Sequence, residues 1–214
     1  MIRKILNFIL NIIFPIECFG CGESDVLFCE GCINKFGNAK PANVDDRLLA
    51  GMNFDHSSPV VKLLEFMKYK FNQDCAKIMA QILYLRLKDE LIVMREKGFI
   101  LTFTPLHKKR LHWRGFNHAE LICRELSKLC EISVIPCFIK IKNTKTQVGL
   151  HRAERLKNLE NAFKISEEYQ KTKPQKIIIF DDVYSTGSTL KECAKTLPMD
   201  TQIRLLVLFV NLTK

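Results

Sequence analysis

The chain has 214 residues, of which 47% are apolar and 26% are charged. This length holds one domain of ordinary size with a small appendage, and the composition excludes a disordered or fibrous protein. The formal net charge is +10, and the stretch from 107 to 157 holds twelve Lys/Arg against four Asp/Glu. Such a basic concentration favours anionic partners, namely phosphates, pyrophosphate or a nucleic-acid backbone, although scattered lysines can also serve solubility alone.

The N-terminal residues imitate a secretory signal, because Arg3 and Lys4 precede an apolar run. Asn7 and Asn11 interrupt this run, and no small-residue cleavage site follows it. The run is also shorter than the roughly 20 apolar residues that cross a bilayer. Its apolar residues recur at helical spacing, so we predict an amphipathic helix over 1–16 that docks on the body, with weak membrane association at most.

Nine cysteines without a convincing export signal indicate reduced thiols in a cytoplasmic protein. Four of them form two CxxC pairs, Cys18 with Cys21 and Cys29 with Cys32. Each pair can direct two thiolates at one ion, and four thiolates close a tetrahedral zinc shell. We predict a structural zinc module over 17–36, in preference to a redox CxxC or to buried inert thiols. The other five cysteines are expected to be small buried hydrophobes.

After a polar connector at 37–47, apolar strands alternate with helices. Strands are expected over 48–54, 99–103, 132–135, 176–180 and 203–210, and helices over 60–70, 74–97, 116–130, 151–159 and 189–197. Strands separated by helices indicate an α/β fold with a parallel sheet. Lys68 and Lys70, at the end of one helix, are interpreted as cations placed near the negative pole of the helix dipole.

The segment after the strand at 176–180 has the pattern of a ligand-binding loop. The strand is apolar and β-branched, so it should be buried, and we expect the chain to turn sharply after Phe180. Asp181 and Asp182 follow at the carboxyl end of the sheet, where ligands bind in open α/β folds. Their carboxylates suit ribose hydroxyls or a Mg²⁺ ion bound to them.

Five small residues come next, and their N–H groups and hydroxyls at a helix N-terminus suit a phosphate. They are Ser185, Thr186, Gly187, Ser188 and Thr189. The alternative is an ordinary strand-to-helix turn with an Asp-rich cap, which would not require the whole pattern. Neither GxxxxGK[ST] nor GxGxxG occurs in the sequence.

The segment at 178–189, IIFDDVYSTGST, resembles the phosphoribosyl pyrophosphate (PRPP) signature of type I phosphoribosyltransferases. Further stretches resemble the competence protein F (ComF) family, which also carries an N-terminal four-cysteine zinc module. These stretches are residues 105–120 and 145–150 together with Arg152, Arg155, Asn158 and Phe163. His118 stands where glutamine is common in that family.

The resemblance implies a type I phosphoribosyltransferase-like domain over 48–214 that binds PRPP with Mg²⁺. Asp181 and Asp182 would take the ribose, and residues 185–189 the 5′-phosphate. The segment 107–117 would be the pyrophosphate loop. The residues assigned to pyrophosphate are Lys108, Lys109, Arg110, Arg114 and Gly115, the last because it permits a tight turn.

The resemblance also implies a competence factor that handles single-stranded DNA in the cytoplasm during natural transformation. A competence helicase or the DNA-uptake machinery would be its candidate protein partners. Trp113 is either a core residue or a stacking surface for a base. The candidate DNA-binding residues are Lys108, Lys109, Arg110, Arg114, Lys140, Lys142, Lys145, Arg152 and Arg155.

The alternative function is an active phosphoribosyltransferase that joins PRPP to an acceptor and releases pyrophosphate with Mg²⁺ assistance. No segment offers a recognisable acceptor pocket, and the sequence assigns no catalytic residue. Because a fold does not establish an activity, enzymatic turnover stays an open question at the level of the sequence.

Overall fold

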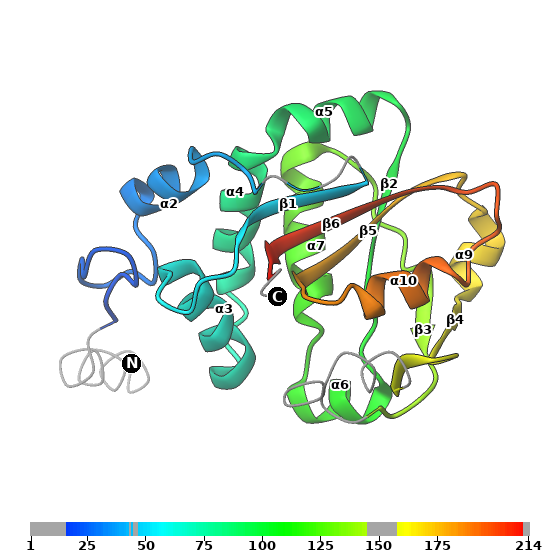
Figure 1. Ribbon diagram of the computed structural model, residues 1–214. Helices are drawn as coiled ribbons and strands as arrows, with labels where there is room; N and C mark the ends of the chain where they lie inside the picture. The colour runs from blue at the N-terminus through cyan, green and yellow to red at the C-terminus, as the bar shows by residue number, and fades with distance from the viewer. Residues whose placement is uncertain (1–15, 43, 45–46, 145–157, 212–214) are drawn as a thin grey trace, which may run out of the picture.

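A four-stranded sheet forms the centre of the protein (Figure 1). The computed structural model describes residues 16–42, 44, 47–144 and 158–211. The strands lie in the order β1-β6-β5-β2. Their bounds are β1 (Leu48–Asn53), β2 (Ile100–Phe103), β5 (Lys176–Tyr184) and β6 (Gln202–Val210). All three neighbouring pairs are parallel, which confirms the α/β fold with a parallel sheet.

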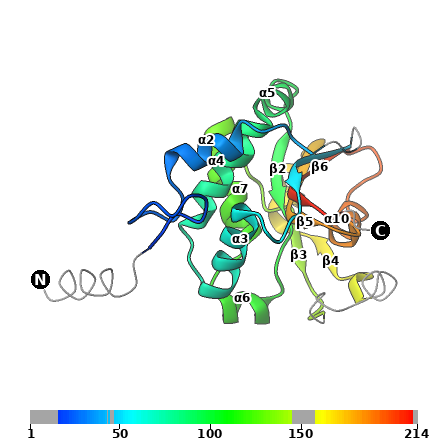
Figure 2. The same ribbon diagram turned by 60° about the vertical axis from the view of Figure 1, so that its left-hand side comes forward.

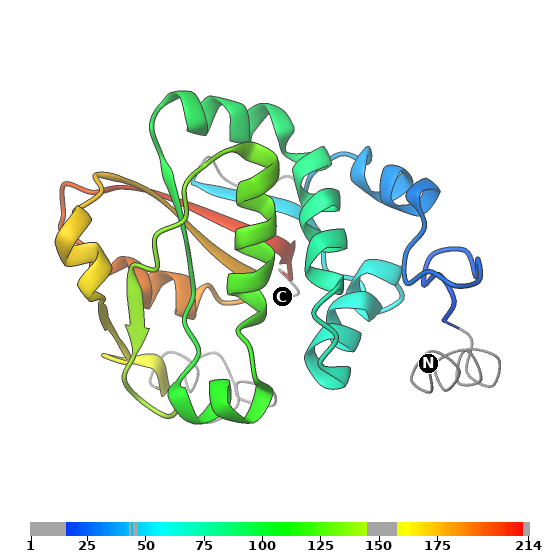
Figure 3. The ribbon, with the colours of Figure 1, turned by 180° about the vertical axis from the view of Figure 1, so that it is seen from behind.

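Helices cover both faces of this sheet (Figure 2). The helices are α2 (Glu30–Gly37), α3 (Pro59–Lys70), α4 (Cys75–Arg86), α5 (Lys88–Glu96), α6 (Lys108–Arg114), α7 (His118–Cys130), α9 (Glu167–Thr172) and α10 (Ser188–Ala194). One face carries α3, α4 and α7, and the other carries α10. Seen from behind, α4 and α7 run side by side across the sheet and pack against each other (Figure 3).

Strand β5 supplies side chains to both cores in alternation. Ile178 and Phe180 are fully buried with the residues of α3, α4 and α7, whereas Ile177 and Ile179 are fully buried with those of α10. Successive side chains of a strand point to opposite faces of the sheet. The same alternation therefore sends the next two residues of β5, both aspartates, toward opposite faces.

The expected sharp turn after Phe180 is wrong, because β5 continues to Tyr184. Asp181 pairs with Val207, and Tyr184 pairs with Val210 at the end of β6. The neighbouring strand thus offers hydrogen-bonding partners to the whole segment. Ladder pairing of this kind outweighs the low strand propensity of two adjacent aspartates.

Several other elements differ from the sequence-based expectation. The helix expected over 74–97 is two helices, α4 and α5, which are separated at Leu87. The strand expected over 132–135 contributes a single parallel bridge between Leu101 and Val134. An antiparallel pair, β3 (Phe138–Lys140) with β4 (Phe163–Ile165), had no sequence signal, because three-residue strands show no periodicity.

The segments around α6 and α9 also differ from the expectation, and two expected helices lie mostly outside the described residues. The expected pyrophosphate loop at 107–117 contains the helix α6, and α9 was not expected. The amphipathic helix expected over 1–16 lies outside the described residues except for Ile16. Most of the helix expected over 151–159 also lies outside them.

The cysteine-rich segment is anchored on the α3 and α4 side of the body. Phe19 meets Phe66 of α3 in an edge-to-face contact with ring centroids 5.4 Å apart. Arg86 of α4 donates three hydrogen bonds to main-chain carbonyls, to Phe36 at 2.6 Å, Lys40 at 2.8 Å and Gly51 at 2.9 Å. One guanidinium thus ties the segment and its connector to β1. Within the described ranges, no helix is both long and apolar enough to cross a membrane.

Candidate functional site

The four cysteines of the two CxxC pairs converge on one point. The Sγ atoms of Cys18, Cys21, Cys29 and Cys32 lie within 4.8 Å of one another, and those of Cys21 and Cys29 are 3.6 Å apart. A tetrahedral zinc ion with Zn–S bonds of about 2.3 Å requires sulfur atoms about 3.8 Å apart. The donor set therefore fits a single zinc ion with four thiolate ligands.

The local electrostatics also suit a cation. Burial opposes ionisation of Cys18, but main-chain N–H groups, including those of Cys29 at 3.3 Å and Gly20 at 3.4 Å, lower the pKa of Cys18 to about 6. Burial and the neighbouring thiols raise the pKa of Cys32 to about 12. One thiolate forms readily, whereas four together require a bound metal ion to offset their repulsion.

The acid pair of β5 lies on a cavity of about 450 Å³ at the carboxyl ends of the strands. Four residues of the predicted PRPP loop line it, namely Asp181, Asp182, Ser185 and Thr189. Three of the predicted basic residues line it as well, namely Arg110, Arg114 and Lys140. The structure thus brings residues from β3, β5 and α6, far apart in sequence, around one space.

Asp182 is held by two partners on the α3 and α7 side of the sheet. Its Oδ2 contacts Lys68 Nζ and lies 3.2 Å from His118 Nε2. Burial alone would raise the pKa of Asp182, but these partners hold it well below its usual range. Burial lowers the pKa of His118, whereas Lys68 places a positive charge against the carboxylate. Asp182 is consequently an ionised carboxylate inside the protein.

The sequence-based interpretation of Lys68 was therefore incomplete. Lys68 and Lys70 do lie in the last turn of α3, as expected. Lys68 turns toward the acid pair and lines its cavity, whereas Lys70 is exposed. The pattern of the helix end gave no indication of this contact, because α3 and β5 are more than 100 residues apart in sequence.

Asp181 has a different environment from its neighbour. It accepts hydrogen bonds from Thr104 Oγ1 at 2.8 Å and from the N–H group of Asp182 at 3.0 Å. Burial and the negative charge of Asp182 raise the pKa of Asp181 to about 7. Lys140 is buried nearby, and burial together with Arg110 lowers the pKa of Lys140 to about 8. Two groups on the cavity thus titrate near neutral pH.

The turn after β5 leaves a small hollow beside the acids. Gly187 has φ +69°, in the left-handed region that favours glycine, and a Cβ there would lie 2.6 Å from the ring of Tyr184. Thr186 Oγ1 accepts a hydrogen bond from the N–H group of Ser188 at 3.3 Å. The hollow, of about 20 Å³, is lined by Asp181 and by the turn residues 185–189. It therefore adjoins the cavity through Asp181.

The remaining predicted residues lie apart from the cavity or outside the described chain. Lys108 and Lys109 are exposed on α6, and Gly115 ends α6 with φ +79°. Lys142 is exposed, and its Nζ donates to the carbonyl of Glu160 at 2.7 Å. Lys145, Arg152 and Arg155 lie outside the described residues.

Thr104 is a polar residue of the cavity that the sequence analysis missed, and Asn117 was assigned only as part of the expected pyrophosphate loop at 107–117. The side chain of Asn117 donates to the carbonyl of Thr104 at 2.9 Å and caps α7 by accepting from the N–H group of Ala119 at 3.1 Å. Thr104 directly follows the buried strand β2. A polar residue at the carboxyl end of a second parallel strand was the signal that could have found it.

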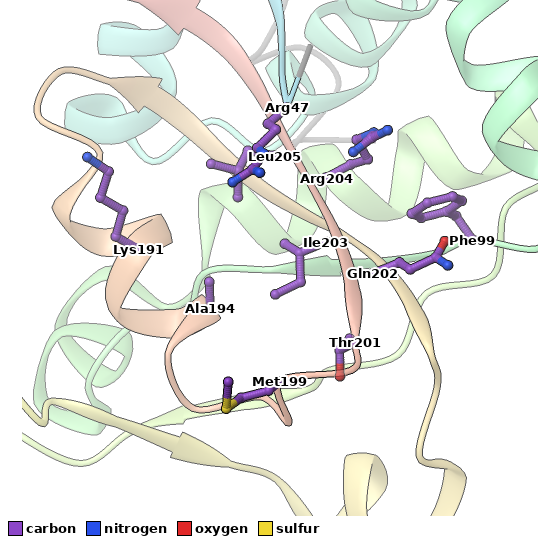
Figure 4. Close-up of a pocket in the computed structure, with 10 residues that line it drawn as sticks. All are labelled: Arg47, Phe99, Lys191, Ala194, Met199, Thr201, Gln202, Ile203, Arg204 and Leu205. Carbon is purple, nitrogen blue, oxygen red and sulfur yellow. The ribbon is translucent and has the colours of Figure 1, made fainter. Parts of the chain in front are cut away.

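A second hollow, of about 590 Å³, lies at the opposite end of the sheet (Figure 4). Its lining includes Arg47, Lys191, Arg204 and Ile203. Arg47 precedes β1, and Gln202 begins β6, so this hollow lies at the amino ends of the strands. It contains none of the residues that the sequence assigns to PRPP.

The zinc site yields a first prediction. Cys21 is exposed, so Cys21→Ser removes one ligand without removing a core side chain. We expect metal analysis to find one zinc ion per wild-type chain, and we expect the variant to lose zinc to a chelator at much lower concentration and to unfold at lower temperature. Cys75→Ala, outside the cluster, should retain the metal. Wild-type protein that is folded and free of zinc would contradict the assignment.

The raised pKa of Asp181 yields a second prediction. A carboxyl whose folded-state pKa lies above its unfolded value of about 3.9 stabilises the protein at low pH, and this stabilisation is lost as pH rises toward 7. Asp181→Asn cannot ionise. The free energy of unfolding of the variant relative to wild type should therefore increase between pH 4 and pH 8, by up to about 4 kcal/mol.

Denaturant unfolding at several pH values measures this difference directly. Asp200→Asn, a substitution at an exposed position, serves as the matched control and should leave the difference nearly constant. A constant difference for Asp181→Asn as well would show that Asp181 ionises normally in the folded protein.

No protein-family model matches the chain, but several known bacterial proteins are similar to it in sequence. It is 28% identical over 186 residues to competence protein F of Haemophilus influenzae, covering 86% of this chain and 79% of that protein. It is 31% identical over 150 residues to DNA utilization protein YhgH of Escherichia coli, covering 67% of this chain and 63% of that protein. The corresponding protein of Salmonella typhimurium is 32% identical over 149 residues. With its four-cysteine cluster and parallel sheet, the chain is homologous over most of its length to competence protein F and to DNA utilization protein YhgH.

Proposed function

We propose that the chain handles single-stranded DNA during natural transformation and binds PRPP with Mg²⁺ at the cavity of the acid pair. The observation that carries the proposal is the composition of this one cavity. It combines Asp181 and Asp182 with the start and end of the small-residue turn and with four cations from other elements. An acid pair beside a phosphate-sized turn and surrounding cations matches the parts of a sugar phosphate that carries pyrophosphate.

The small-residue turn is the candidate for the 5′-phosphate. Only a residue without a side chain fits at position 187, because the ring of Tyr184 occupies that space. The glycine therefore permits the left-handed turn whose residues line the hollow. Ser185, Thr186 and Ser188 add hydroxyl groups around the hollow. Hydroxyls and main-chain N–H groups together are the donors that phosphate oxygens accept.

The two acids have different proposed roles. Asp182 is held by Lys68 and His118 and keeps its negative charge, so its proposed role is to orient the bound ligand. Asp181 gains or loses its proton near neutral pH, so its charge can change when a ligand binds. A bound Mg²⁺ would favour the ionised form of Asp181 and would neutralise phosphate charge.

The cations around the cavity are the candidates for pyrophosphate. Arg110 and Arg114 are one helical turn apart on α6, and guanidinium groups can bind phosphate oxygens in pairs. Arg114 is oriented by His118, whose Nδ1 lies 3.0 Å from its NH1 atom. Lys140 approaches from β3. Lys108, Lys109 and Gly115 lie outside this lining, so the proposal for pyrophosphate rests on the other residues.

The proposed DNA role rests on the relatives and on charge. Competence protein F and DNA utilization protein YhgH are named for competence and for DNA use. The chain has a formal net charge of +10, and α6 presents exposed lysines beside the cavity. Such a surface attracts a phosphate backbone without regard to sequence. A competence helicase or the uptake machinery stays the candidate protein partner.

Phosphoribosyl transfer is a second candidate, favoured by one observation. Lys140, which is buried, and Asp181, which is half-buried, are titratable groups on the cavity with pKa values of about 8 and about 7. Groups shifted toward neutral pH are typical of catalytic sites, although structural networks also produce them. Release of pyrophosphate in the presence of candidate bases, abolished by Asp182→Ala, would favour a transferase over a binding protein.

The DNA proposal predicts a salt-dependent affinity for unstructured oligonucleotides. If about four phosphates are contacted, the affinity should fall roughly 50-fold between about 50 and 200 mM salt, because the slope for single strands is about 0.7 per contact. Fluorescence anisotropy at several salt concentrations measures this slope. Replacing both Lys108 and Lys109 by alanine should reduce the slope and the affinity.

The matched control replaces two exposed lysines at the two ends of α5, Lys88 and Lys97, which lie on a different part of the surface. That double variant should keep the wild-type slope. Negligible binding of wild-type protein at low salt, with the fold and the zinc content intact, would contradict the proposed DNA role.

A further inference from the structure

Three large aromatic side chains are exposed next to the cavity, and we call them the aromatic ledge. They are Tyr69, Phe71 and Trp113, with exposed fractions of 62%, 41% and 66%. Tyr69 and Trp113 also line the cavity of the acid pair. Large aromatic residues normally stabilise a protein by burial, so an exposed cluster of them indicates a contact surface.

The ledge is assembled from two separate elements. Phe71 follows α3 and Trp113 belongs to α6, and their ring centroids are 5.4 Å apart with planes inclined at 78°. Phe71 has φ +57°, a left-handed conformation that a bulky side chain adopts only at a cost in energy. The chain therefore keeps a strained residue at the end of α3, where its ring rests on Trp113 and is still exposed.

Positive charge surrounds the ledge. Helix α6 has the sequence KKRLHWR and contains no acidic residue, and the last turn of α3 contributes Lys68 and Lys70. Both acids that line the same cavity as the ledge already have partners: Asp182 contacts Lys68 and His118, and Asp181 accepts a hydrogen bond from Thr104. A partner of this surface should thus offer flat apolar faces together with negative charge.

We propose that the aromatic ledge stacks unpaired bases of single-stranded DNA while the cations of α6 contact the adjoining phosphates. Every base has a π-face that stacks on an aromatic ring, and a single strand exposes these faces next to its phosphates. A duplex hides the same faces between its base pairs. The inference rests on the proposed binding of single-stranded DNA, and it assigns that binding to the rim of the PRPP cavity.

Trp113 is the only tryptophan of the chain, so tryptophan fluorescence, excited selectively over the four tyrosines, reports on the ledge alone. Titration with an oligothymidylate at low salt is expected to quench this fluorescence to a saturating value. An oligomer of the same length with abasic sugars carries the same phosphates but no bases. It should bind at least about tenfold more weakly and leave the fluorescence nearly unchanged.

Substitution separates stacking from phosphate contact. Trp113→Ala should weaken oligothymidylate binding about 5- to 100-fold by anisotropy, while the dependence of affinity on salt stays the same. Trp113→Phe should restore most of the affinity. Met199→Ala is the matched control, because Met199 is the most exposed large apolar side chain among the described residues and lines the hollow at the opposite end of the sheet.

The outcomes distinguish this inference from the proposed function. Wild-type protein that binds no oligonucleotide would overturn both. Binding without quenching, and with equal affinity in Trp113→Ala, would overturn the ledge alone. Two further results would overturn it in the same way: a Trp113 response to anionic phospholipid vesicles but not to oligothymidylate, or self-association that Trp113→Ala abolishes without any oligonucleotide response.

Discussion

The arrangement of the site depends on one ion pair, between the buried carboxylate of Asp182 near the end of β5 and the partly buried amine of Lys68 near the end of α3. A buried carboxylate without a partner would not stay ionised, and losing one member of such a pair costs about 3–5 kcal/mol. His118 joins the pair from α7, so a single carboxylate links the central strand to two helices of one face. The negative charge kept on Asp182 contributes to the raised pKa of Asp181, and the same contact holds the end of α3 at the cavity.

This arrangement places two chemically different surfaces next to each other. Asp181, Asp182 and the turn around Gly187 form a polar cavity at the carboxyl ends of the strands, and the aromatic side chains of Tyr69 and Trp113 lie at its rim. Lys68 and Tyr69 are adjacent in sequence. A ligand that draws Asp182 away from Lys68 would consequently shift the end of α3 and the ledge that begins there. We therefore expect a ligand of one surface to change the affinity of the other surface for its own ligand.

Local patterns predicted those parts of the protein that local sequence determines. The spacing of Cys18, Cys21, Cys29 and Cys32 predicted a cluster that the structure brings together, and the apolar strand before Asp181 predicted a buried central strand of a parallel sheet. These local patterns could not predict contacts between segments that are distant in sequence. The partner of Asp182 comes from α3, and the continuation of β5 to Tyr184 depends on pairing with β6. Neither has a local signal, because the first depends on where α3 packs and the second on the order of strands in the sheet.

Calorimetric titration of the zinc-loaded protein with PRPP at pH 7, with and without Mg²⁺, tests the account most directly. Performed in two buffers of different ionisation enthalpy, it also counts the protons that binding releases. We expect one Mg²⁺-dependent PRPP site per chain. We also expect the heat of binding to differ between the two buffers, because Asp181 loses its proton when the ligand binds. Folded, zinc-loaded protein that gives no saturable heat with PRPP and Mg²⁺ would contradict the account.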